Sequence, residues 1–156
     1  MFESVLFCRD KRGHGRICRT KHQKIKTKSG IVEVERRKIM EITWKTLDHI
    51  LMVKICGDID HHTCEMLRQQ VDQALESTNS RSILFSFAQV SFMDSSGIGV
   101  LIGRYKLVQR LGGKIAVACP SDRVREIFRL SALDKLFPFF ETEEAALADL
   151  KGGNQK

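Results

Sequence analysis

Asp94, Ser95, Ser96 and Gly97 are the residues of this chain whose types and order could do chemistry. Two hydroxyls follow a carboxylate, and a glycine follows them. If this run begins a helix, its free N–H groups and positive dipole end would tolerate a phosphate on a serine. That phosphate would add a charge of roughly −1.5 to −2 and disrupt a partner docked over the turn. Ordinary helix capping is the alternative interpretation of the same residues.

The segments on either side of this run predict a buried strand followed by a helix. Residues 81–90 carry the apolar run of a strand covered on both faces. From Ile98 the apolar residues recur every three or four positions, as on one face of a helix, and Gly112 and Gly113 end it. The predicted helix therefore covers 96–111, and Asp94 or Ser95 is its N-cap.

The remaining pattern alternates between strands and helices. Further strands are expected at 42–44, 50–55, 114–119 and 136–140, with Pro138 placing the last at an edge. Further helices are expected at 63–77 with Thr63 as N-cap, at 121–130 with Ser121 as N-cap, and after Thr142. Helical crossovers between strands indicate an α/β fold with a mixed sheet.

Four motifs in order resemble a STAS domain, and within that family the anti-sigma factor antagonists of endospore-forming bacteria. The motifs are Gly57 to Thr63, Ser91 to Val100, Gly103 to Lys106, and Leu111 to Gly113. The resemblance runs from about Met40 to Leu150. It implies a mixed, mostly parallel β-sheet of about four to five strands with about four helices.

The resemblance also implies a cycle of partner binding and phosphorylation. The unphosphorylated form would bind an anti-sigma factor that is also a serine kinase using ATP and Mg²⁺, and would thereby release a sigma factor of sporulation. The kinase would phosphorylate Ser95, the serine directly after the aspartate, with Ser96 as its rival, and a PP2C-type phosphatase would reset the protein. The implied partner face comprises Asp58, Asp60, His61, His62, Asp94, Ser95, Ser96, Gly97 and the exposed Arg104.

The positive charge of the chain lies in one segment. The net charge is +7 and the pI about 9.3, yet residues 1–39 carry +8 and residues 40–156 carry −1. We expect 1–39 to be a basic, disordered leader, 40–150 the STAS domain and 151–156 a flexible tail. Nucleic-acid binding by the leader is a lesser alternative. We expect no direct nucleic-acid partner, because the domain itself has no basic patch with interleaved aromatics.

The leader has a second interpretation, which follows from the genetic code. Residues 35–40 can be back-translated as a purine-rich ribosome-binding sequence a few bases before an ATG. Met40 would then be the native start. Arginine codons of the CGN type at Arg36 and Arg37 would remove this argument.

Enzyme, metal and membrane functions are disfavoured. The nucleophile elbow G-x-S-x-G and the P-loop are both missing. The thiols and imidazoles of Cys8, His14, Cys18 and His22 lack the paired spacing of a zinc site. We expect no cofactor, no metal and no catalysis, and, without an export signal or a bilayer-length apolar run, a cytoplasmic protein that binds no membrane.

Gly99 and Gly103, four residues apart, are expected to let a neighbouring element pack closely against the helix.

The competing function is a STAS accessory or scaffold subunit, of the lipid-transport or stressosome type, that docks a partner without a phosphorylation cycle. The intact Asp94 to Gly97 run argues against it.

Overall fold

The computed structural model describes residues 7–9, 15–17 and 40–152. Within residues 40–152 the strands are β3 (Glu41–Leu47), β4 (Ile50–Cys56), β5 (Ser82–Gln89), β6 (Ile115–Ala118) and β7 (Phe139–Phe140). Its helices are α1 (His61–Thr78), α2 (Ser95–Arg110), α3 (Asp122–Leu130) and α4 (Glu143–Gly152), with a 3₁₀ turn η1 (Leu133–Lys135). The sequence predicted each of these strands and α-helices.

The domain begins with a hairpin and continues with parallel crossovers. β3 and β4 pair antiparallel, and the turn between them places Asp48 and His49 at φ values of 51° and 63°, as a tight hairpin turn requires. β5, β6 and β7 then add in parallel, in the order β3-β4-β5-β6-β7. The predicted α/β fold with a mixed, mostly parallel sheet is confirmed.

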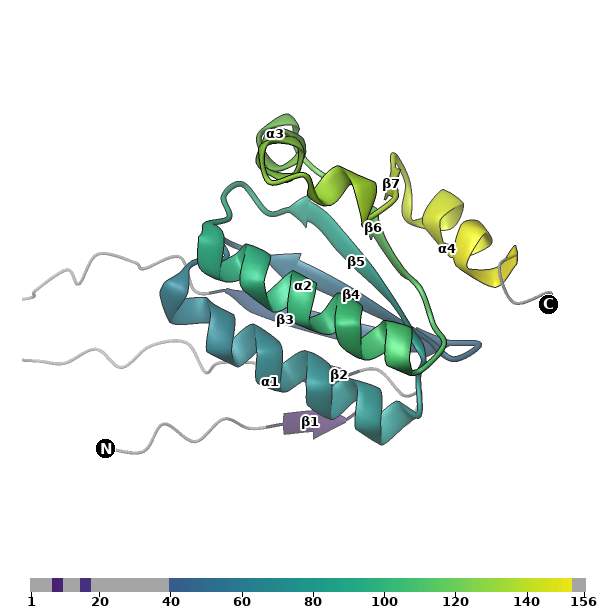
Figure 1. The fold of residues 1–156 in the computed structure, drawn as a ribbon. Helices are drawn as coiled ribbons and strands as arrows, with labels where there is room; N and C mark the ends of the chain where they lie inside the picture. Colours follow the sequence, from purple (N-terminus) through teal and green to yellow (C-terminus); the bar gives the residue numbers. More distant parts are fainter. Residues whose placement is uncertain (1–6, 10–14, 18–39, 153–156) are drawn as a thin grey trace, which may run out of the picture.

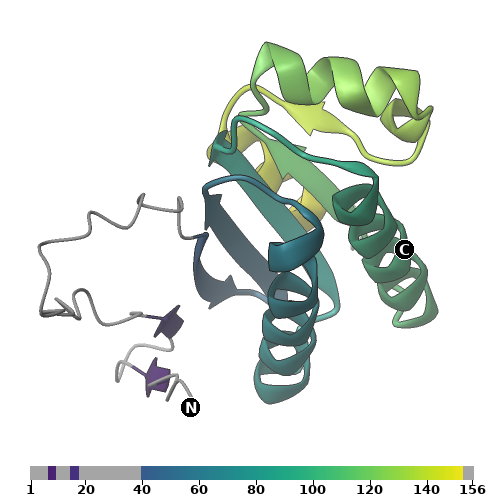
Figure 2. The ribbon, with the colours of Figure 1, turned by 90° about the vertical axis from the view of Figure 1, so that its left-hand side faces the viewer.

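Helices cover both faces of this sheet unequally (Figures 1 and 2). One face packs against α1, α2 and α3 in the larger core, where Phe85, Phe87 and Phe128 are fully buried. The other face packs against α4 through Ala146 and Leu150. No helix in the described ranges is long and apolar enough to cross a bilayer.

Two expectations about element ends are wrong. α1 begins at His61, and its N-cap is Asp60, three residues before the expected cap Thr63. The last strand covers only Phe139–Phe140, because the chain from Leu136 to Pro138 forms the turn that follows η1. The prolyl carbonyl of Pro138 accepts a hydrogen bond from the Val117 N–H at 3.0 Å, and β7 is the edge strand, as expected.

Two strands of the leader lie within the described residues. β1 (Phe7–Arg9) pairs with β2 (Gly15–Ile17), and β2 pairs with β3 through Gly15 and Arg16, which extends the sheet. The rest of residues 1–39, and residues 153–156, lie outside the described residues. The proposed domain boundaries and the start at Met40 stay predictions.

Candidate functional site at the adjoining N termini of α1 and α2

Main-chain hydrogen bonds join the loops that precede α1 and α2. The Ile59 N–H donates to the Phe92 carbonyl at 3.0 Å, and the Asp94 N–H donates to the Ile59 carbonyl at 3.1 Å. These bonds form a short parallel bridge between Ile59 and Met93. The two helices consequently start side by side at the carboxyl end of the sheet (Figure 1).

Asp94 caps α2 and also reaches α1. Its Oδ1 accepts hydrogen bonds from the N–H groups of Ser96 at 2.8 Å and Gly97 at 3.2 Å. Its Oδ2 accepts one from the N–H of His61 at 3.1 Å. Of the two N-caps considered for this helix, Asp94 is therefore the correct one.

Asp60 caps α1 in a reciprocal capping box. Its Oδ1 accepts from the N–H groups of His62 and Thr63, and the Asp60 N–H donates to the Thr63 hydroxyl at 2.9 Å. Burial works to raise the pKa of Asp60, but the hydrogen bonds from Thr63 and His62 outweigh it and leave the pKa below its ordinary value. An aspartate three residues before a threonine was the sequence signal for this cap.

Gly97 lets the first turn of α2 lie directly on the bridge. A Cβ at this position would come within 2.6 Å of Met93 Cγ and 2.8 Å of Ile59 Cγ2. Gly97 is buried, so it lies beneath the exposed residues at the start of α2. Gly99 and Gly103 differ, because a Cβ at either position would meet nothing within 4 Å. The expected packing role of these two glycines is wrong.

The two candidate hydroxyls differ in exposure. Ser95 is exposed, whereas Ser96 is half-buried. Among the described residues neither hydroxyl has a hydrogen-bond partner, and the Ser96 N–H is held by Asp94. Ser95 therefore presents the more accessible nucleophilic oxygen.

The α1 side of the site carries exposed imidazoles and a bound carboxylate. His61 and His62 are exposed, with ring centroids 5.8 Å apart. Asp58 Oδ1 accepts a hydrogen bond from the Ser91 hydroxyl at 2.8 Å, which ties the loop before α1 to the loop before α2. We call the following residues the docking surface: Asp58, Asp60, His61, His62, Asp94, Ser95 and Ser96.

Arg104 is not exposed, contrary to expectation, and its place in the partner face stays a prediction. Its side chain is only 12% exposed, and its Nε lies 3.0 Å from Asp72 Oδ1 on α1. The N–H is not aligned for a hydrogen bond, so the contact is an ion pair between α1 and α2. Burial raises the pKa of Asp72, against the attraction of Arg104 and Arg68. The signal was available, since Arg104 follows Leu101 by three residues and precedes Val108 by four, on the buried face.

Two contacts near the docking surface had no counterpart in the sequence predictions. One is the Ser91 to Asp58 hydrogen bond described above. The other places the guanidinium of Arg123, at the start of α3, 5.5 Å from the centre of the Phe92 ring. Both pair residues 31 or more positions apart, so helix or strand periodicity could not reveal them.

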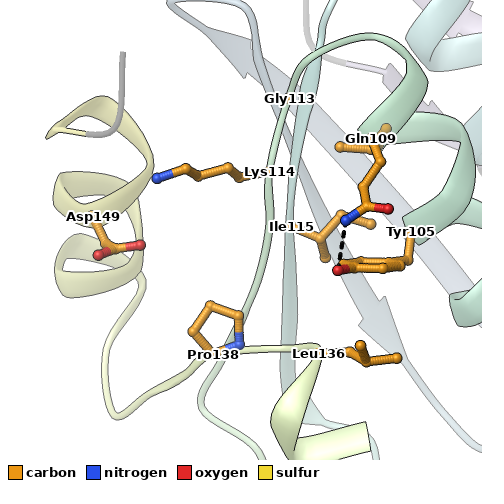
Figure 3. Close-up of a pocket in the computed structure, with 9 residues that line it drawn as sticks. Tyr105, Gln109, Gly113, Lys114, Ile115, Leu136, Pro138 and Asp149 are labelled. Carbon is orange, nitrogen blue, oxygen red and sulfur yellow. Dashed lines mark hydrogen bonds between the residues drawn. The ribbon is translucent and has the colours of Figure 1, made fainter. Parts of the chain in front are cut away.

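A cavity of about 250 Å³ lies at the opposite end of α2. Tyr105, Gln109, Lys114, Ile115, Pro138 and Asp149 are among the residues that line it (Figure 3). The amide of Gln109 donates to the Tyr105 hydroxyl at 2.7 Å. None of the residues that line this cavity belongs to the docking surface.

Comparison with known proteins assigns the family. The STAS domain family model matches residues 41–146. The chain belongs to the STAS domain family. This STAS domain is 39% identical over 102 residues to an anti-sigma F factor antagonist from Paenibacillus polymyxa, covering 65% of this chain and 87% of the relative.

Solved STAS structures agree with this relationship. The anti-sigma factor antagonist SpoIIAA in its unphosphorylated form matches with a TM-score of 0.63 and 28% identity, covering 71% of this chain and 96% of that chain. The Bacillus cell fate determinant SpoIIAA in the phosphorylated form matches with a TM-score of 0.57 and 28% identity, covering 69% and 97%. The resemblance to STAS anti-sigma factor antagonists is confirmed.

Proposed function

We propose that this STAS domain is an anti-sigma factor antagonist switched by phosphorylation of Ser95. The unphosphorylated form binds an anti-sigma factor that is also a serine kinase, and this binding releases the sigma factor. The kinase supplies ATP and Mg²⁺ and transfers the terminal phosphoryl group to the Ser95 hydroxyl. The phosphorylated form no longer binds, and a PP2C-type phosphatase restores it.

The observation that carries this proposal is the placement of Ser95. Its exposed hydroxyl stands at the first residue of α2, directly after the N-cap Asp94. Helix N–H groups and the helix dipole favour an anion at this place. The fold can therefore accept the modification, and the charge acts on whatever lies over the docking surface.

Electrostatics explain why a single phosphate suffices. It brings a charge of roughly −1.5 to −2 to a surface that already holds several carboxylates. Like charges brought together at an interface cost several kcal/mol, on the order of what separates a stable complex from a weak one. Because the main-chain bridge between Ile59 and Met93 fixes the backbone beside Ser95, the partner meets this charge at a defined place.

The relatives support the same function and the same biological setting. The Paenibacillus relative is named for antagonism of an anti-sigma F factor, and SpoIIAA has been solved in unphosphorylated and phosphorylated forms. We therefore place this chain in the control of a sporulation sigma factor. The exposure of Ser95 favours it over Ser96 as the phosphorylated residue.

The test is to incubate the full chain with its cognate kinase, ATP and Mg²⁺ and to map the phosphate by mass spectrometry. The matched variants are Ser95→Ala and Ser96→Ala. We expect one phosphate on Ser95, no phosphorylation of Ser95→Ala and normal phosphorylation of Ser96→Ala. Phosphate on Ser96 in the wild type would move the site, and no phosphate on either serine would contradict the switch.

A further inference from the structure

The carboxylate of Asp94 divides its two oxygens between two helices. Oδ1 holds the N–H groups of Ser96 and Gly97 in α2, and Oδ2 holds the N–H of His61, the first residue of α1. An N-cap needs only the first of these roles. The second role links the residue next to Ser95 with the other half of the docking surface.

Asp94 serves a group that the cap of α1 leaves free. Asp60 accepts from the N–H groups of His62 and Thr63. The His61 N–H is bonded to Asp94 instead, across 33 residues of sequence. The start of α1 is consequently fixed by two carboxylates, one from its own loop and one from the loop that carries Ser95.

The surroundings of Cys64 give a second sign of this proximity. Cys64 lies buried in the first turn of α1. Burial, followed by the negative charges of Asp94 and Asp60, raises the pKa of its thiol to about 11. The negative charge of Asp94 therefore acts on a thiol of α1 as well as on the start of α2.

We propose that Asp94 is a positioning residue that couples Ser95 to the N terminus of α1, and that phosphorylation of Ser95 breaks the Asp94–His61 hydrogen bond. This inference rests on the proposed function of Ser95. A phosphate on the first residue of α2 can accept from the same N–H groups as Asp94 Oδ1, and it repels the carboxylate. Both oxygens belong to one planar group, so displacement of Oδ1 withdraws Oδ2 from His61. Phosphorylation of Ser95 then loosens the part of the docking surface that carries His61 and His62, and it adds negative charge at Ser95.

Amide hydrogen exchange tests the coupling without a partner. Phosphoserine is placed at position 95 of the full chain by genetic code expansion, and exchange is followed by NMR in the modified and unmodified proteins. We expect the His61 amide to exchange about tenfold faster or more in the modified protein, as for a lost hydrogen bond to a charged acceptor. The amides of His62 and Thr63, held by Asp60, are internal controls that change little. Unchanged exchange at His61 would overturn the coupling.

A matched pair of substitutions tests the positioning role. His61→Pro removes the N–H that Asp94 binds, whereas His61→Ala keeps it and removes only the imidazole. Proline is favoured at the first helical residue, and Asp60, at φ −122° and ψ −179°, already has the extended backbone that a following proline requires. Circular dichroism checks that both variants fold.

Binding to the cognate kinase then compares the two variants with Ser95 unmodified. We expect His61→Pro to bind about tenfold more weakly than His61→Ala, as for the loss of one charge-assisted hydrogen bond. Equal binding would overturn the positioning role. Failure of the unmodified wild type to bind would instead contradict the proposed function, and the exchange experiment would still decide the coupling.

Discussion

The helices α1 and α2 contact each other in two regions that are built differently. At their N termini, carboxylates bind backbone N–H groups, and the side chains of Ser95, His61 and His62 stay exposed. Farther along, Arg104 and Asp72 use their own charged groups to pair across the helices. At the N termini the backbone is fixed and these three side chains stay exposed. At the Arg104–Asp72 pair the charged side chains themselves are bound in the contact between the helices.

Under the proposed function, this difference explains which part of the helix pair meets the partner. A charged residue contributes to recognition only if its polar atoms are accessible to a partner. Arg104 carries a full charge but is 12% exposed, while the neutral hydroxyl of Ser95 is open to solvent. Accessibility, more than residue type, separates the docking surface from the interhelical ion pair.

The largest stability effect is expected at Gly97, beneath the docking surface. Gly97→Ala places a methyl group within 2.6 Å of Met93 Cγ and 2.8 Å of Ile59 Cγ2, and overpacking of this kind costs about 1–3 kcal/mol. Gly99→Ala is the control, because its Cβ meets nothing and should raise the free energy of unfolding by up to about 1 kcal/mol. Urea denaturation measures both. Equal effects of the two substitutions would show that the bridge does not constrain α2.

The next effect concerns the ion pair in the middle of the helices. Arg104→Ala leaves the carboxylate of Asp72 partly buried without its cation, and we expect a loss of about 1–2 kcal/mol after allowance for its partial exposure. Replacing both residues, as Arg104→Met with Asp72→Leu, should recover most of that loss. The measurement is urea denaturation together with kinase binding at a temperature where every variant is folded. Weaker binding by folded Arg104→Ala would return Arg104 to the docking surface.

The pH dependence of stability should have opposite signs in the two regions. The folded-state pKa of Asp60 lies below its ordinary value of 3.8, so its contribution is present above that value and is lost as the pH falls through the folded pKa. The folded-state pKa of Asp72 is raised by burial, so its contribution is present below 3.8 and is lost as the pH rises through the folded pKa.

Asp60→Asn and Asp72→Asn test these signs. Urea denaturation between about pH 3 and pH 6 compares each variant with the wild type. Relative to its variant, the wild type should lose stability on acidification for Asp60 and gain it for Asp72. Slopes of the same sign would contradict the contrast between the two regions.

The smallest effect is expected in thiol reactivity. With a pKa of about 11, the Cys64 thiol is ionised to roughly one part in a thousand at pH 8, and it is buried. Cys56 is exposed. Maleimide labelling of the folded chain, mapped by peptide mass spectrometry, should modify Cys56 and spare Cys64. Asp94→Asn should raise Cys64 labelling slightly by removing one nearby charge, and labelling of Cys64 as fast as Cys56 would contradict this account.

The sequence predicted the strands and helices well because each produces a pattern of apolar residues within its own segment. Ile83 to Phe87 form an apolar run, and Ile98 to Val108 repeat at helical spacing, so β5 and α2 could be placed without any partner. The same local chemistry limited the N-cap of α2 to Asp94 or Ser95, and the structure selects Asp94. The four motifs from Gly57 to Gly113 also held enough information to predict the family, which the family model confirms.

What the sequence could not supply depends on contacts between distant segments. The pairing of Arg104 with Asp72 requires a second helix beside α2, and the Asp94–His61 hydrogen bond requires the two loops to lie in parallel. The open space beside Gly99 and Gly103 was equally hidden, because spacing on a helix does not say whether a neighbour is present. Tertiary placement decides all three.

The most direct test of the central claim is to titrate the cognate anti-sigma kinase with two forms of the full chain in a calorimeter. One form is unmodified, and the other carries phosphoserine at position 95. We predict saturable binding of the unmodified form and no measurable binding of the phosphorylated form at the same concentrations. Equal affinity of the two forms would contradict the switch.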